Sequence, residues 1–120
     1  MTARSIVHIE IPASDREASA GFYAELFGWT YEHFSQPMDY TMFQSGNISG
    51  GFPDIGEYYK PGEVVIYIAS QDLAADLDRI QSMGGSLLMP PTEVPGSGWM
   101  AMFSDPAGNR LALWKSSAQS

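Results

Sequence analysis

The sequence contains no cysteine, so disulfide bonds, thiolate metal ligands and cysteine nucleophiles are all excluded. Basic residues are also scarce: 6 Lys and Arg stand against 14 Asp and Glu, for a net charge of −8. That charge would repel nucleic-acid phosphates and an anionic membrane surface, so we expect neither partner. Long apolar runs are lacking too, because residues 64–69 fall far below the roughly 20 residues that span a bilayer. With no apolar segment near the amino terminus, a cytoplasmic location is predicted.

What the chain does contain fits one domain, residues 1–120, which would bury roughly two thirds of its unfolded surface. Near the end, two strand-like runs flank residues 105–109, which have the sequence Asp-Pro-Ala-Gly-Asn. Asp can bond the backbone two residues on, while Gly and Asn tolerate positive φ, so this segment predicts the turn of a hairpin. Beyond it, Leu111 and Leu113 occupy alternate positions, which indicates a strand with one face toward a core.

The first half of the chain predicts a strand, a helix and three more strands. Residues 6–11 alternate in polarity, so Ile9 and Ile11 should face the core while His8 and Glu10 share the opposite face. Ser14 and Glu17 have capping-box spacing, which predicts the start of a helix, and Gly28 predicts its end. Between them, the apolar residues recur at helical intervals: Ala18, Phe22, Tyr23, Leu26 and Phe27. Three short strands are expected at residues 29–34, 40–44 and 47–52.

The second half repeats this order after a turn-rich connector at residues 53–62. A strand at 64–69 precedes a helix capped by Asp72 and ended by the Gly84-Gly85 pair. The apolar face of that helix is expected to comprise Leu73, Leu77, Ile80 and Met83. Further strands are expected at residues 86–89, 99–103 and 110–114, with residues 90–98 forming either a lid or a rim loop.

The two halves can be superposed by one constant shift, since the interval from Asp15 to Gly28 equals that from Asp72 to Gly85. Units of about 50 residues, at roughly 5–52 and 63–115, cannot bury their sheet faces separately. The sequence therefore predicts an α+β fold in which two βαβββ modules form a curved, cup-like mixed sheet with helices on the outside. The same shift places Val65 at the position of His8 and Tyr67 at that of Glu10.

Several short motifs, in this order and at this spacing, resemble the vicinal oxygen chelate superfamily: His-Ile-Glu-Ile-Pro at 8–12, Asp15 followed by Ala18, Phe22-Tyr23, Leu-Phe-Gly-Trp at 26–29, Gly84-Gly85, and Asp-Pro-Ala-Gly-Asn at 105–109. That superfamily includes glyoxalase I, extradiol dioxygenases, fosfomycin resistance enzymes and bleomycin-binding proteins. The resemblance covers essentially the whole chain. It implies the cup-shaped fold described above and, in the enzymes, a divalent metal ion in the cup.

The resemblance also implies four metal-ligand positions, of which this sequence keeps only His8. The second position falls in residues 48–51, Ile-Ser-Gly-Gly, which offer no carboxylate or imidazole, and the third and fourth fall on Val65 and Ala112. A catalytic divalent ion normally takes at least three protein ligands. We therefore predict no metal-binding residues and expect no cofactor; a divalent metal is disfavoured.

The candidate site residues are two polar residues of the first strand and three aromatic residues of the second half. His8 and Glu10 are the candidates for acid-base roles; a buried Glu10 would have its charged form disfavoured, whereas a rim position would leave it solvated. The predicted ligand contacts are His8, Glu10, Tyr67, Trp99 and Trp114. Tyr40, Tyr67, Trp99 and Trp114 are of a kind more often found in a core or an interface than in a ligand site, although Tyr67 and Trp114 have the alternation expected of the cup face. Which face of residues 99–103 lines the cup stays open, because both sets of side chains are apolar.

Three functions fit these residues. The favoured one is metal-free binding of a small organic molecule, cationic or aromatic, as implied by the resemblance to bleomycin-type binding proteins and by the acidic charge. The second is a glyoxalase-related lyase, isomerase or dioxygenase that uses His8 with unidentified metal ligands or metal-free acid-base chemistry. The third is a noncatalytic regulatory or interaction module. The resemblance further implies a homodimer.

Overall fold

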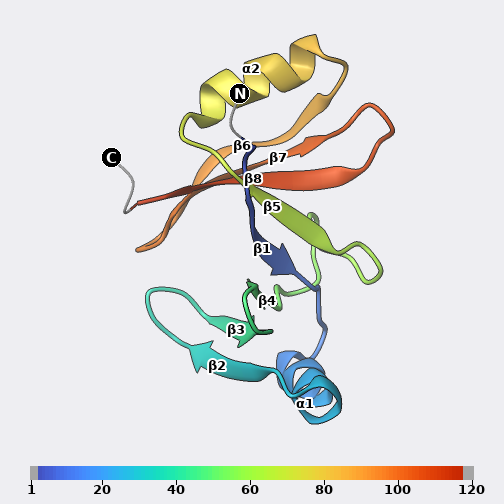
Figure 1. Cartoon of the computed structure of the whole chain (residues 1–120), viewed down its shortest axis with the longest axis vertical. Helices are drawn as coiled ribbons and strands as arrows, with labels where there is room; N and C mark the ends of the chain where they lie inside the picture. Colours follow the sequence, from blue (N-terminus) through green and yellow to red (C-terminus); the bar gives the residue numbers. More distant parts are fainter. Residues whose placement is uncertain (1–2, 118–120) are drawn as a thin grey trace. The chain divides into compact units, whose positions relative to one another are not determined.

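The computed structural model describes residues 3–117 and confirms the predicted α+β class. Strand, helix and three strands follow one another twice along the chain (Figure 1). The first set is β1 (Ile6–Glu10), α1 (Arg16–Phe27), β2 (Thr30–Phe34), β3 (Tyr40–Gln44) and β4 (Ser49–Gly51). The second is β5 (Val65–Ala69), α2 (Leu73–Ser82), β6 (Ser86–Val94), β7 (Gly98–Ser104) and β8 (Arg110–Ser116).

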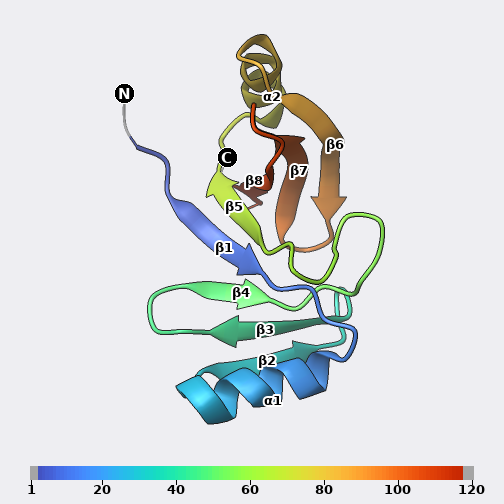
Figure 2. The same cartoon turned by 90° about the vertical axis from the view of Figure 1, so that its right-hand side faces the viewer.

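The eight strands form one sheet, and the chain divides into two compact units, each with four of these strands and one helix. We call residues 8–65 the first unit, and residues 66–117 with the segment 3–7 the second unit. In the first unit the strands lie in the order β2, β3, β4, β1, with β1 parallel to β4 and the other neighbours antiparallel. Helix α1 runs alongside β2 (Figure 2). Between helix and sheet lies an apolar core of Ala13, Ala20, Phe43 and Phe52, onto which Ile11, Tyr23 and Trp29 pack.

Helix α1 begins one residue later than the capping-box spacing predicts. The N-cap is Asp15, not Ser14, and its carboxylate accepts a hydrogen bond from the Ala18 amide at 3.1 Å. Gly28 ends the helix with φ of 76°, as predicted, and its amide donates to the Ala24 carbonyl. The predicted apolar face was wrong in part: Phe22 and Leu26 are 58% and 61% exposed, and Phe27 is exposed as well. The helix docks through Ala20 and Tyr23, which leaves the flanking apolar side chains in solvent.

In the second unit the order is β5, β8, β7, β6, and α2 packs on the last three of these strands. Asp72 caps α2 as predicted, with its carboxylate accepting from the Ala75 amide at 3.0 Å. The predicted core face of β8 is confirmed, since Leu113 is buried and Leu111 packs beside it. The core comprises Leu73, Leu77, Ala101, Phe103 and Leu113, with Ile68, Ile80 and Leu111 against it. Met83, which was predicted to lie on the helix core face, is exposed.

Residues 90–98 are not the loop that the sequence suggested. Strand β6 continues through both prolines to Val94, and only a short turn separates it from β7. Prolines are tolerated there because β6 is the last strand of its sheet, where an unpaired side needs no backbone donor. The pairing with β7 shifts register between Leu87 and Thr92, as expected of bulges near prolines.

The turn at residues 105–109 forms as predicted. Asp105 accepts hydrogen bonds from the amides of Ala107 and Asn109, at 3.0 and 2.8 Å, and thereby closes the β7–β8 hairpin. Neither helix in residues 3–117 is long and apolar enough to cross a membrane.

Candidate functional site

Polar and aromatic side chains that are not part of the apolar core beneath α1 lie on one face of the first unit's strands. Glu10 pairs with Gly51, Gly51 with Met42, and Met42 with Glu32, so these four residues form a row across β1, β4, β3 and β2. Directly opposed residues project from the same side of a sheet. The next pair along the strands is Phe34 with Tyr40. The opposite face carries Phe43 and packs on α1, so the row lies on the face away from the helix.

At one end of this row, three side chains form a hydrogen-bonded line. The Tyr40 hydroxyl donates to Glu10 Oε2 at 2.5 Å and lies 2.9 Å from His8 Nε2. The His8 and Tyr40 rings are stacked, with centroids 6.2 Å apart. Since the single phenolic proton is used toward Glu10, His8 must donate through Nε2–H to the phenol oxygen. We call Glu10, Tyr40 and His8 the polar triad.

Burial shapes the charges of the polar triad. Glu10 is only 6% exposed, so the predicted alternative of a solvated rim carboxylate was wrong. Burial is the main cause that lowers the pKa of His8, against an opposing effect of the Glu10 charge. Burial, reinforced by the Glu10 charge and hydrogen bond, raises the pKa of Tyr40 far above its usual value. At neutral pH the triad therefore holds a neutral imidazole and a neutral phenol.

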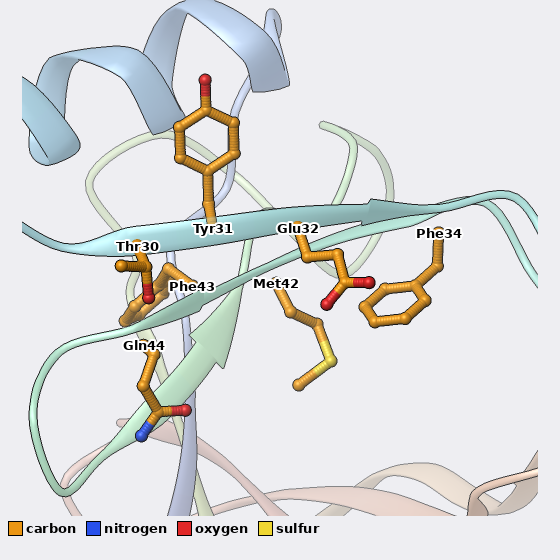
Figure 3. A pocket seen from close by; sticks show the side chains of 7 residues that line it. All are labelled: Thr30, Tyr31, Glu32, Phe34, Met42, Phe43 and Gln44. Carbon is orange, nitrogen blue, oxygen red and sulfur yellow. The ribbon is translucent and has the colours of Figure 1, made fainter.

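Beside the triad, an open hollow of about 320 Å³ extends over β2 and β3. Figure 3 shows Glu32, Phe34 and Met42 on one side of the ribbon, and Tyr31 pointing away from them toward α1. The lining residues are Thr30, Tyr31, Glu32, Phe34, Met42, Phe43 and Gln44. An aromatic ring and a thioether next to a carboxylate suit a guest with an apolar body and a donor or cationic group.

The other predicted ligand contacts belong to the second unit. Tyr67, 3% exposed, pairs with Ala112, and its hydroxyl donates to Met100 Sδ at 3.7 Å. Trp114 pairs with Met100 and is half-buried on the same face. This resolves which side of β7 accompanies Tyr67: it is the side of Met100, while Ala101 packs on α2.

Trp99 does not join them. It alternates with Met100 along β7, pairs with Lys115, and is 44% exposed on the other face of the sheet. His33, the second histidine, bonds Thr41 Oγ1 at 2.6 Å and lies 3.2 Å from Asp39, away from the row.

The sequence pattern missed Tyr40, Phe34, Met42 and Glu32 as site residues. Their alternation in residues 29–34 and 40–44 was visible, but only the pairing of β2 with β3 shows which alternate set faces away from α1. For Tyr40, the assignment to a core or interface overlooked its polar end.

The family model described as Glyoxalase/Bleomycin resistance protein/Dioxygenase superfamily matches residues 5–113. The chain belongs to this superfamily. A curated member, an anthracycline biosynthesis protein of Streptomyces peucetius, is 33% identical over 88% of this chain and 45% of its own length. The chain thus spans about half the length of the first curated relatives it matches.

Two further proteins match most of the chain. A glyoxylase-like domain-containing protein of Didymella fabae is 33% identical, with 88% of each chain covered. A methylmalonyl-CoA epimerase from Mycobacterium tuberculosis has the same fold, with a TM-score of 0.72, 15% identity, and coverage of 98% of this chain and 93% of that one. The family model fixes the superfamily, and the likeness to the epimerase concerns the fold alone.

The metal ion expected of enzymes in this superfamily does not fit the residues present. Within residues 3–117, no three His, Asp or Glu side chains lie close enough together to hold an ion. His8 Nε2 is committed to Tyr40. Of the other implied positions, Val65 and Ala112 are buried apolar residues, and residues 48–51 offer no carboxylate or imidazole.

Proposed function

We propose that this superfamily member binds a small organic molecule, without a metal ion, on the face of the first unit that carries the polar triad and the hollow. The hydrogen-bonded triad next to a hollow with both apolar and polar lining carries this proposal. Binding sites commonly combine apolar walls with a few fixed polar groups that orient the ligand. Phe34 and Met42 supply the walls, and Glu32 supplies a polar group. Tyr40, which pairs with Phe34, fixes the triad at the edge of the hollow.

The class of guest follows from the lining. Glu32 lies beside Phe34 and Met42, and the chain has a net charge of −8, so an aromatic guest carrying an amine fits better than an anion. Similarity to a protein of anthracycline biosynthesis also directs attention to flat, polycyclic aromatic compounds.

The test is calorimetric titration of chelator-treated protein with anthraquinone and tetracyclic compounds, each with and without an amino group. We expect saturable binding that the chelator does not weaken, with tighter binding for the amines. Amide shifts in two-dimensional NMR spectra should cluster on β2 and β3. Absence of binding to every probe, or binding that requires added metal, would contradict the proposal.

A matched pair of variants locates the site. Phe34→Ala removes the aromatic wall and is expected to weaken binding about 2- to 13-fold, since aromatic contacts contribute about 0.5–1.5 kcal/mol beyond area burial. Phe22→Ala removes an equally large ring from the exposed surface of α1 and should leave affinity unchanged. Equal effects of the two variants would place the guest elsewhere.

A second candidate function is metal-free proton transfer. The observation that favours it is the neutral, half-buried His8 linked through Tyr40 to a buried carboxylate. A neutral imidazole can accept a proton from carbon next to a carbonyl. Deuterium exchange into simple α-hydroxyketones and thioesters in heavy water, followed by NMR, would detect this activity; exchange that persists in His8→Ala would rule out His8.

The expectation of a homodimer stays a prediction, as does the cytoplasmic location. Light scattering on the eluting protein would measure the mass of the assembly against the 13.1 kDa chain.

A further inference from the structure

Tyr40 is the group on which the polar triad converges. Its single hydroxyl bonds both Glu10 Oε2 and His8 Nε2. Tyr40 lies on β3, whereas Glu10 and His8 lie on β1, about 30 residues earlier in the chain. Without it, a carboxylate that is 6% exposed would lose this donor. The arrangement is also directional: His8 donates to Tyr40, and Tyr40 donates to Glu10.

The hydroxyl reaches this point only because residue 51 is glycine. A Cβ placed on Gly51 would lie 1.8 Å from Tyr40 Oη and 2.1 Å from Cζ, far inside contact distance. Gly51 does not have positive φ, so the backbone itself would accept a side chain. The phenol therefore occupies the space in which any side chain of residue 51 would begin. Tyr40 in this position and a metal-ligating side chain at 51 exclude each other.

We propose that Tyr40 is a positioning residue whose hydroxyl holds His8 and Glu10 together and, in doing so, closes the site to a metal ion. Coordination through His8 Nε2 would require that atom to lose both its proton and its bond to Tyr40. Supply of a second ligand from position 51 would require Tyr40 to leave. This inference rests on the proposed metal-independent function and gives it a structural cause.

The first test is ¹⁵N-detected NMR of the histidine rings at neutral pH in the wild type and in Tyr40→Phe, which keeps the ring and deletes the hydroxyl. In the wild type, we expect His8 to be protonated at Nε2, with a slowly exchanging ring proton shifted downfield. In Tyr40→Phe, this slow exchange should be lost. His33, which bonds Thr41 instead, is the internal control and should not change. A wild-type His8 protonated at Nδ1, or slow exchange that survives in Tyr40→Phe, would overturn the inference.

The second test adds Ni²⁺ and Zn²⁺ to the wild type and to the double variant Tyr40→Ala/Gly51→Glu. In the double variant, Tyr40→Ala removes the ring that fills the space beside residue 51, and Gly51→Glu places a carboxylate there. We expect negligible binding by the wild type, about one ion per chain for the double variant, and loss of that binding when His8→Ala is added. Stoichiometric, His8-dependent binding by the wild type, or no gain in a folded double variant, would refute the proposal. If the double variant does not fold, the NMR test still decides.

The two proposals fail separately, because neither of these tests uses an organic ligand. A site that binds none of the aromatic probes can still show the predicted His8 tautomer and the predicted metal response.

Discussion

Adding one methyl group at position 51 tests the packing that builds the candidate site. In Gly51→Ala, the three nearest atoms to the new Cβ all belong to Tyr40, at 1.8, 2.1 and 2.6 Å. Contacts this short cannot be absorbed by small adjustments, so the ring must move as a whole. Its bonds to Glu10 and His8 would then break.

The cost has two parts. Forcing a side chain out of a well-packed position typically costs about 1–3 kcal/mol. Loss of the Tyr40 hydrogen bond to the buried Glu10 carboxyl group costs about 1–3 kcal/mol more. We therefore expect Gly51→Ala to lower the free energy of unfolding by about 2–6 kcal/mol. The extent to which Tyr40 can find another rotamer decides the position within that range.

Urea denaturation measures this loss of stability in four proteins: the wild type, Gly51→Ala, Tyr40→Ala and the double variant Tyr40→Ala/Gly51→Ala. In the Tyr40→Ala background, the clashing ring is absent, so Gly51→Ala should cost less than about 1 kcal/mol. Gly21→Ala is the matched control, since a Cβ there meets no atom within 4 Å and sits in a helix; it should stabilise by about 0.5–1 kcal/mol. An equal cost of Gly51→Ala with and without the Tyr40 ring would refute the assignment of the clash to Tyr40.

Three further predictions concern the framework. Asp76→Asn should reduce stability by about 0.5–1 kcal/mol at pH 7, because Asp76 accepts two hydrogen bonds from the partly exposed Arg4. The hydrogen bond from Arg4 is the main cause that lowers the pKa of Asp76 in the folded protein. The stabilisation is therefore fully present above the unfolded pKa of about 3.8 and is lost as the pH falls through the lower folded pKa. Urea denaturation at a series of pH values would measure this loss. Asp72→Ala should cost about 1 kcal/mol through loss of the cap, while Asp72→Asn should cost much less in the same assay. Leu77→Ala should cost about 2–5 kcal/mol, and a thermal midpoint that is unchanged would contradict its place in the core beneath α2.

Features that depend on nearby residues were predictable from sequence. Asp72 and Gly28 are where a cap and a helix end were expected, and Asp105 makes the backbone bonds expected of its turn. Each is set by the chemistry of one side chain and the few residues around it. The repeat of βαβββ units was also readable, because equal intervals between caps and glycines do not depend on how the units pack.

Features that depend on which strands become neighbours were not predictable. The helical spacing of Phe22 and Leu26 gave the same signal as that of Tyr23, and only docking on Trp29 and Phe52 shows which ring is covered. The prolines of β6 read as a loop because a single sequence does not reveal that this strand ends its sheet. Likewise, Tyr40 entered the site through pairings of β3 with β4, and of β4 with β1, that no local pattern encodes.

The two units carry the same row of positions but fill it differently. Glu10, Gly51 and Met42 lie across the first unit's sheet, and Tyr67, Ala112 and Met102 lie across the second.

The residue two positions before the methionine of each row also differs between the units. In the first unit it is Tyr40, which donates to Glu10; in the second it is Met100, which accepts from Tyr67. A phenol beside a carboxylate and an imidazole is a group that can orient a ligand, while a phenol on a thioether, with Met102 and Ala112 fully buried, is chiefly packing. The repeat therefore preserves the scaffold in both halves, and the glycine at 51, by admitting Tyr40, makes the polar triad possible in the first unit.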